Sequence, residues 1–407
     1  MPNIKLDEPV IVDSSTNEPI CWGAYQLPRL RLGDNNKLYY RFHGRRDCIE
    51  CVGQEDKMFI FSSVDEGKTW QKEDSFLEFY KSAPLLPNGD RLQFGECQPL
   101  KNPTLPDKDE RRKTRIMSNQ LAYKFSEIKA IYGNKVNLNY PVYRIKKGET
   151  EPVAETCTIH WDNCPMCYHE SVDLLVYPTI EPDELIIAPN GALIMPVHGP
   201  AFFEDGSVSP HSCMHFLISE DNGYNWNLQG TLYYREEYNT PTAHDVEGFS
   251  EISGTFSENG ELVMFLRTGS LVPFNNDGVG LPIPNLYVAR SKDLCKTFYG
   301  ISPFNSYGMR PYIIKMNDTC HLLTYGRPGS VLQASFDKNL EKWEKPIKII
   351  DVPQEDIYTK YFEYTCCNNF LCKYNENTAF LAYSDFTRKE NGKQAKTLMV
   401  RKITVEY

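Results

Sequence analysis

The sequence predicts an all-β fold, a six-bladed β-propeller built of four-stranded antiparallel sheets. Two kinds of repeat lead to this prediction: turns centred on an aspartate, and hairpin tips rich in Asn and Gly, recur at intervals of tens of residues. Aromatic residues make up 13% of the 407, mostly Tyr and Phe, which favours many short strands over long amphipathic helices. We expect residues 1–407 to form a single propeller domain.

The aspartate-centred turn is clearest at 63–70, where the sequence is Ser-Val-Asp-Glu-Gly-Lys-Thr-Trp. Asp65 can accept hydrogen bonds from backbone N–H groups just downstream, Gly67 can adopt a positive φ, and Trp70 can bury a large ring. Further copies lie at 219–226, 291–298 and 335–343. The first of these keeps the features just named, the second lacks the glycine, and the third is one residue longer.

The number of hairpin tips predicts the number of blades. An Asn or Asp turn followed by an apolar strand occurs six times, at 34–36, 88–90, 190–191, 259–260, 317–318 and 375–377. Asn-Gly between alternating apolar residues is a strong hairpin signal, and a hairpin followed by an aspartate-centred turn gives four strands per unit. The wide gap between the second and third tips predicts an insertion at 101–173 in blade two, with a short helix near 120–130. We expect the strand around 9–12 to pair with the last sheet and close the ring.

Composition excludes several classes of function. The net charge of −10 and the absence of Lys/Arg clusters argue against binding to nucleic acid or to an anionic membrane surface. No apolar run approaches the roughly 18 residues of a membrane span, and the first residues lack the apolar core of a secretory signal. The thirteen scattered cysteines fit a reducing compartment. We therefore expect a cytoplasmic protein, or a secreted one if a signal has been removed.

The candidate metal ligands are two Cys-x-x-Cys pairs, at 48–51 and 164–167, the second of which is flanked by His160 and His169. One pair supplies only half of a tetrahedral zinc site unless the histidines join it. The pairs are too far apart in sequence for a zinc ribbon, so we expect ordinary thiols and neither a metal nor another cofactor.

The aspartate-centred turns resemble the Asp-box, or BNR, repeats of the sialidase (neuraminidase) superfamily, in which six blades are usual. The segment 251–267, with a Glu before the hairpin Gly and an Arg at the end of the next strand, resembles the fourth-blade motif of bacterial exo-sialidases. The resemblance implies that Glu251 is the base that activates a tyrosine nucleophile, and that Arg267 is one of three arginines that bind the substrate carboxylate. Arg suits this role because its guanidinium can bind a carboxylate in bidentate fashion.

Shorter matches suggest the remaining site residues. Tyr364, followed by Thr, resembles the nucleophile motif, and the stretch 42–47 resembles the one that leads to the acid, which would be Asp47. Tyr-Gln-Leu-Pro at 25–28 resembles the Tyr-Arg-Ile-Pro of the first strand, so Gln26 stands where the family has its first carboxylate-binding Arg. Arg29, Arg31 or Arg45 could replace that Arg in space, and candidates for the third arginine are Arg310 and Arg327.

The resemblance therefore implies a sialidase-like glycoside hydrolase that releases a terminal, acidic sugar with retention, using Tyr364 and Glu251 as the nucleophilic pair. A neutral Tyr avoids the repulsion that a carboxylate nucleophile would meet at an anionic substrate. Two alternatives are open. His198, grouped with other loop histidines and a Tyr, would suit a propeller polysaccharide lyase or a glycosidase for uronic acid or rhamnose. Gln26 favours a propeller that binds glycans without turnover.

Overall fold

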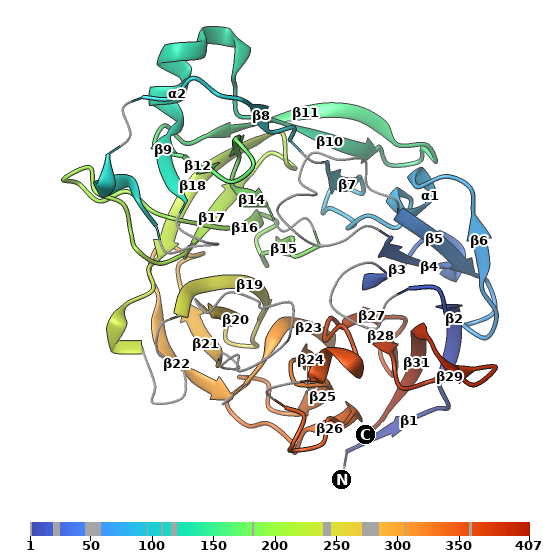
Figure 1. The fold of residues 1–407 in the computed structure, drawn as a ribbon. Helices are drawn as coiled ribbons and strands as arrows, with labels where there is room; N and C mark the ends of the chain where they lie inside the picture. The colour runs from blue at the N-terminus through green and yellow to red at the C-terminus, as the bar shows by residue number, and fades with distance from the viewer. Residues whose placement is uncertain are drawn as a thin grey trace.

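The computed structural model describes residues 2–18, 25–44, 58–95, 97–106, 109–114, 120–180, 183–238, 246–270, 285–305, 307–357 and 360–407. Strands account for 51% and helices for 7%, which confirms the all-β class. Figure 1 shows the sheets arranged around a common centre, with β3, β15, β19, β23 and β27 on the inner side. Over these described ranges no helix is both long and apolar enough to cross a membrane.

Three sheets are four-stranded antiparallel meanders in chain order. One consists of β3 (Gln26–Leu32), β4 (Leu38–His43), β5 (Met58–Ser63) and β6 (Gln71–Glu73). Another consists of β19 (Val246–Phe256), β20 (Leu262–Ser270), β21 (Leu286–Ser291) and β22 (Tyr299–Asn305). The third consists of β23 (Met309–Asn317), β24 (Cys320–Gly326), β25 (Ser330–Ser335) and β26 (Ile347–Ile350). Their first strands face the centre (Figure 1), and β19 contacts β23.

The last sheet joins the two ends of the chain. It contains β27 (Phe370–Lys373), β28 (Thr378–Asp385) and β31 (Lys396–Glu406), and β31 also pairs with β1 (Asn3–Leu6) and β2 (Val10–Ser15). Val10 lies opposite Val400, so the predicted pairing of the N-terminal strand with the last sheet is confirmed. A small hairpin, β29 (Lys389–Glu390) and β30 (Lys393–Gln394), extends from this sheet.

The largest sheet has eight strands and unites two antiparallel units. One unit is β7 (Arg91–Phe94), β10 (Asn139–Ile145) and β11 (Val153–His160). The other is β14 (Thr179–Ile180), β15 (Ile186–Ile187), β16 (Leu193–Gly199), β17 (Cys213–Ser219) and β18 (Asn225–Leu232). They are joined by a parallel pairing of β11 with β18, which places Thr158 opposite Asn225. Each unit thereby protects an edge that would otherwise be exposed.

The segment 101–173 has two parts. One is a separate sheet of β8 (Leu100–Lys101), β9 (Leu121–Lys124), β12 (Pro165–His169) and β13 (Leu174–Val176), with the helix α2 (Phe125–Tyr132) near the predicted position. The other is β10 and β11, which belong to the eight-stranded sheet. The other helices of the described residues are short: α1 (Leu77–Tyr80), η1 (Asp34–Asn36), η3 (Glu110–Arg112), η4 (Gly133–Lys135), η5 (Glu236–Tyr238) and η6 (Tyr361–Glu363).

The aspartate-centred turns form the hydrogen bonds expected from their sequence. Asp65 Oδ1 accepts from the backbone N–H groups of Lys68 at 3.1 Å and Thr69 at 2.9 Å, and the Trp70 indole donates to the Gly67 carbonyl at 3.1 Å. The copy at 219–226 repeats these bonds at the same three distances. In that copy Trp226 is fully buried and packs against Phe94 of β7. The turns therefore fix strand ends and fill the space between sheets.

Candidate active site

Three strands that face the centre carry a β-bulge. The pairing register shifts between residues 26 and 29 in β3, between 250 and 252 in β19 and between 309 and 312 in β23. In β19 the extra residue is Glu251. Bulges redirect side chains and are frequent next to active sites, so the residues at these three positions are candidates for a functional site.

Glu251 is bound by two arginines. Its Oε1 lies 3.0 Å from Arg267 Nη1 and 3.4 Å from Arg310 Nη1, and its Oε2 accepts the backbone N–H of Arg310 at 3.1 Å. Burial alone would raise the pKa of Glu251, but the guanidinium groups of Arg267, Arg310 and Arg327 lower it to about 2. The side chains of Glu251, Arg267 and Arg310 are 16%, 18% and 13% exposed, respectively. Glu251 is thus a carboxylate at neutral pH, within reach of solvent.

The backbone at two of these arginines is strained. Arg310 has φ 46° and Arg327 has φ 51°, a region that residues other than Gly rarely adopt. Such positions cost on the order of 1–3 kcal/mol each and tend to occur at functional sites. Arg310 is held by its N–H bond to Glu251, and nearby the N–H of Ile313 donates to Ser253 Oγ at 3.1 Å. Contacts between β19 and β23 therefore maintain the strained geometry.

A second acid–arginine cluster surrounds Asp183. This carboxylate accepts from Arg29 Nε at 2.7 Å, from Arg41 Nη2 at 3.0 Å and from Arg31. Its side chain is only 2% exposed. Burial opposes ionisation, but the charges of Arg41, Arg31 and Arg29 hold the pKa of Asp183 well below its ordinary value. Asp183 was not predicted, because an acid in the stretch Glu-Pro-Asp-Glu at 181–184 resembles a solvated turn.

The two clusters are electrostatically linked. Burial, and then the nearby charge of Arg310, lower the pKa of Arg29. The two clusters together contain two carboxylates, Asp183 and Glu251, and six arginines: Arg29, Arg31, Arg41, Arg267, Arg310 and Arg327. The buried Glu184, which like Asp183 acts on Tyr312, adds a third carboxylate. This local excess of positive charge, in a chain whose net charge is −10, can bind an anionic group.

Tyr364 is paired with a different acid from the one predicted. Its hydroxyl donates to Asp356 Oδ2 at 2.5 Å, and this bond raises the pKa of Tyr364 to about 12. Within the described ranges no hydrogen bond joins Tyr364 to Glu251. Tyr364 packs in one apolar cluster with Phe362, whose ring lies 5.6 Å from the Arg327 guanidinium. Tyr364 thus has Asp356 as its partner and belongs to the apolar cluster whose Phe362 ring contacts Arg327.

The structure describes only some of the other predicted site residues. Arg45 and Asp47, like the Cys48 and Cys51 pair, lie outside the described residues. Gln26 is buried at the bulge of β3, between Tyr25 and Leu27, which have φ values of 65° and 61°. His198 lies near the end of β16, opposite Thr179 on one side and Met214 on the other.

The second Cys-x-x-Cys pair is buried in and beside β12. Burial raises the pKa of the Cys167 thiol to about 12 and holds that of Cys164 well above its ordinary value. His160 contacts Asn225 through Nε2 at 3.1 Å, whereas His169 contacts Gln120 through Nδ1 at 3.3 Å. In the part of the chain that the structure describes, no three His, Cys, Asp or Glu side chains are grouped as metal ligands.

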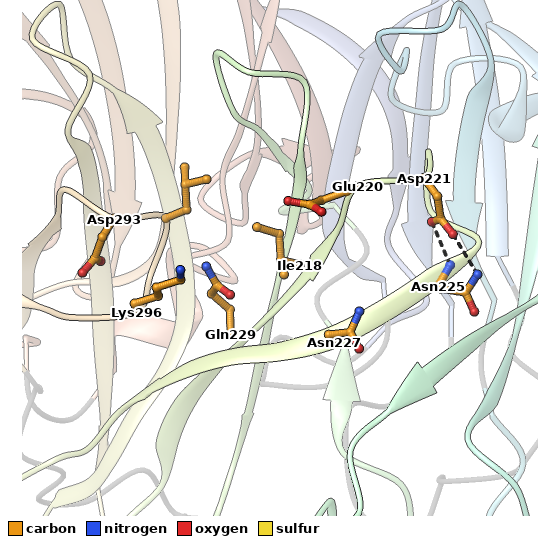
Figure 2. Close-up of a pocket in the computed structure, with 9 residues that line it drawn as sticks. Ile218, Glu220, Asp221, Asn225, Asn227, Gln229, Asp293 and Lys296 are labelled. Carbon is orange, nitrogen blue, oxygen red and sulfur yellow. Dashed lines mark hydrogen bonds between the residues drawn. The ribbon is translucent and has the colours of Figure 1, made fainter.

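A cavity of about 600 Å³ lies apart from both clusters, between β18 and the turn that joins β21 to β22 (Figure 2). It is lined by Ile218, Glu220, Asp221, Asn225, Asn227, Gln229, Asp293, Leu294 and Lys296. These include none of the predicted site residues. The arginine ion pairs and the strained backbone thus indicate a functional site at Glu251, and this cavity is separate from it.

Comparisons with known proteins bear on the fold. No family model and no curated protein sequence matches the chain. A solved protein of unknown function from Dyadobacter fermentans is 16% identical over 100% of both chains, with a TM-score of 0.63. The sialidase of Trypanosoma rangeli is 12% identical over 93% of this chain and 55% of its own, with a TM-score of 0.47. An α-L-arabinanase of Penicillium chrysogenum is 13% identical over 97% and 98%, also at 0.47. The first similarity shows a shared fold along the whole chain, and the other two say nothing about its activity.

Proposed function

We propose that the protein is a six-bladed propeller and a sialidase-like glycoside hydrolase that releases a terminal acidic sugar from a glycan. The blades are the β3–β6, β19–β22 and β23–β26 sheets, the two units of the eight-stranded sheet, and the sheet closed by β1 and β2. The aspartate-centred turns of four blades are Asp-box repeats.

The observation that carries the proposal is the cluster of Glu251 with Arg267 and Arg310. Their side chains come from two neighbouring sheets, meet at bulges and keep access to solvent. Arg267, Arg310 and Arg327 bind the carboxylate of the sugar, and Glu251 holds the guanidinium groups in orientation. Glu251 has a pKa of about 2 in this state, too low for an efficient base, so its role here is to position the arginines.

The reaction begins with attack of the Tyr364 hydroxyl oxygen on the anomeric carbon. Asp356 accepts the hydroxyl proton along the existing 2.5 Å hydrogen bond, which gives it the role first assigned to Glu251. Asp47 donates a proton to the leaving oxygen as the glycosidic bond breaks. Water then attacks the anomeric carbon of the glycosyl intermediate and gives a proton to the Asp47 carboxylate. The bond to Tyr364 breaks, Asp356 returns its proton to the Tyr364 oxygen, and the configuration of the sugar is retained.

Turnover of a panel of aryl sialosides, uronides and neutral aryl glycosides tests this function. We expect activity on an acidic glycoside, and a loss of kcat of about 10²- to 10⁴-fold in Tyr364→Phe and Asp356→Asn. Glu251→Gln should mainly raise KM. Glu261→Gln is the matched control, because Glu261 also pairs with an arginine, Arg290, at 3.2 Å on the same sheet. Unchanged activity in Tyr364→Phe and Asp356→Asn would exclude the assigned nucleophile.

A propeller that binds glycans without turnover is the second candidate, favoured by Gln26 at the first arginine position. It predicts binding of an acidic sugar that depends on Arg267 and Arg310, with no product released from any glycoside of the panel. Calorimetric titration with the free acidic sugar separates this outcome from a chain that neither binds nor hydrolyses it.

A further inference from the structure

The cavity in Figure 2 lies between two neighbouring sheets, with Ile218 of β17 and the β17–β18 turn completing its lining. Strand β18 supplies Asn225, Asn227 and Gln229 from alternate positions, and the turn between β21 and β22 supplies Leu294 and Lys296. Gln229 is the extra residue of a bulge, because the register of β17 and β18 shifts between Phe216 and Leu217. Gln229 and Lys296 both line the cavity, so polar groups from both elements face the same space (Figure 2).

Four polar side chains of this cavity are available to a ligand. Glu220, Asn227, Gln229 and Lys296 make no side-chain hydrogen bond or ion pair to any residue that the structure describes. The two aspartates of the cavity differ from them. Asp293 binds Thr297 through both oxygens, at 2.9 and 2.6 Å, and Asp221 is occupied in the same way by Asn225. The two aspartates therefore stabilise the turns, whereas the other four side chains remain available to a ligand.

The first repeat differs from the cavity at the third residue after the tryptophan. Gln71 and Glu73 follow Trp70 at the same spacing as Asn227 and Gln229 follow Trp226. Glu73 is bound internally, since its Oε1 accepts from Ser62 Oγ at 2.5 Å and from Lys37 Nζ at 2.9 Å. The corresponding Gln229 has no such partner within the described ranges.

The wall of the cavity is held by tight backbone packing. A Cβ at Gly230 would lie 2.1 Å from the carbonyl oxygen of Cys295, so the turn rests directly on β18. Leu294 and Cys295 adopt φ values of 55° and 70°, where the copies at 63–70 and 219–226 have a Gly at the second of these positions. Cys295 is buried while Leu294 lines the cavity. The cavity is thus a fixed part of the fold rather than a gap between loops.

The chemistry of the lining selects a class of ligand. One ammonium group beside three carboxylates disfavours a phosphate or another anion, and the aspartates already use their oxygens in the turns. The amides of Asn227 and Gln229 each donate and accept hydrogen bonds, as a sugar hydroxyl does. Ile218 and Leu294 add apolar surface for the C–H face of a ring. We propose that this cavity binds a short neutral saccharide, at a site separate from Glu251. Its volume of about 600 Å³ is within the usual range for small-molecule sites.

Calorimetric titration of the whole chain with maltotriose, cellotriose, xylotriose and arabinotriose tests the proposal. We expect at least one to bind, and the double variant Asn227→Ala with Gln229→Ala to weaken that binding by about tenfold or more, because two hydrogen-bonding groups are lost. Gln71→Ala is the matched control, since it removes the equivalent exposed side chain of the first repeat. Thermal unfolding of each variant shows whether the fold is retained, and we expect unchanged Tm values because these side chains are surface groups.

The outcomes separate this site from the proposed active site. Binding of the trisaccharide should be the same in Glu251→Gln as in the parent, whether or not the chain hydrolyses any glycoside. The proposal is overturned if none of the four trisaccharides binds in the millimolar range, or if the double variant binds as well as the parent. Equal weakening by Gln71→Ala, or displacement of the trisaccharide by inorganic phosphate, would also overturn it.

Discussion

Asp183 and Glu251 are both carboxylates bound by arginines, yet their surroundings differ. Asp183 is 2% exposed and contacts three guanidinium groups, one of which, Arg31, also donates to Gln93 Oε1 at 2.6 Å. Arg31 and Arg41 each lie within 5 Å of the Phe79 ring, at 4.8 and 4.9 Å. Glu251 is 16% exposed and lies at a bulge beside strained arginines. The difference teaches that the same ion pairing can be closed to solvent in one place and open to it in another.

The largest expected effect is on stability, at the closed cluster. Asp183→Asn leaves three buried guanidinium groups without their counter-charge, and we expect a loss of about 3–5 kcal/mol in the free energy of unfolding. Urea unfolding monitored by tryptophan fluorescence measures it. Glu251→Gln should cost clearly less, because solvent reaches its arginines. A larger loss for Glu251→Gln than for Asp183→Asn would reverse the assignment of the two clusters.

The next effect is on substrate affinity, at the open cluster. Arg267→Lys keeps the charge but loses the planar pair of donors, so we expect KM for the acidic glycoside to rise by about tenfold to a hundredfold. Steady-state kinetics on whichever acidic glycoside is hydrolysed measure the change. Arg290→Lys is the control, since Arg290 pairs with Glu261 on the same sheet. If both variants raise KM equally, the open cluster is not the carboxylate site.

The smallest effect is the pH dependence of stability that Glu251 contributes. Its pKa is about 2 in the folded chain and near the ordinary 4.5 once unfolded. The stabilisation is therefore complete above about pH 4.5 and lost as the pH falls toward 2, because the unfolded chain takes up the proton first. The difference in unfolding free energy between the parent and Glu251→Gln should be constant above this range and shrink below it. A difference independent of pH would contradict the arginine contacts.

Local chemistry explains why much of the fold was predictable. The Asp65 and Asp221 turns depend on residues within eight positions, and each hairpin tip on three or four, so the sequence shows them directly. The parallel pairing of β11 with β18 was not predicted, since it joins edges of two units that meet only after folding. Equally, nothing in the segment 101–173 distinguishes β10 and β11 from the strands of the separate sheet.

The site was predictable only in part. The spacing between Glu251 and Arg267 led to two residues that are in contact, and Arg310 joins them. The pairing of Tyr364 with Glu251 was not found in the structure, because Asp356, eight residues earlier in the chain, holds the hydroxyl. An Asp shortly before a Tyr is too common a pattern to single out. Asp183 was missed because its three partners are distant in sequence, and only the fold brings them together.

The pairing of β1 and β2 with β31 has a consequence for synthesis of the chain. β1 and β2 are synthesised before their partner β31, which lies far along the chain, as the pairing of Val10 with Val400 shows. Until then, their backbone N–H and C=O groups have no ladder to join, and an unpaired strand edge is prone to aggregate. The ring can close only once β31 has been made, so β1 and β2 must remain soluble without their partner until then.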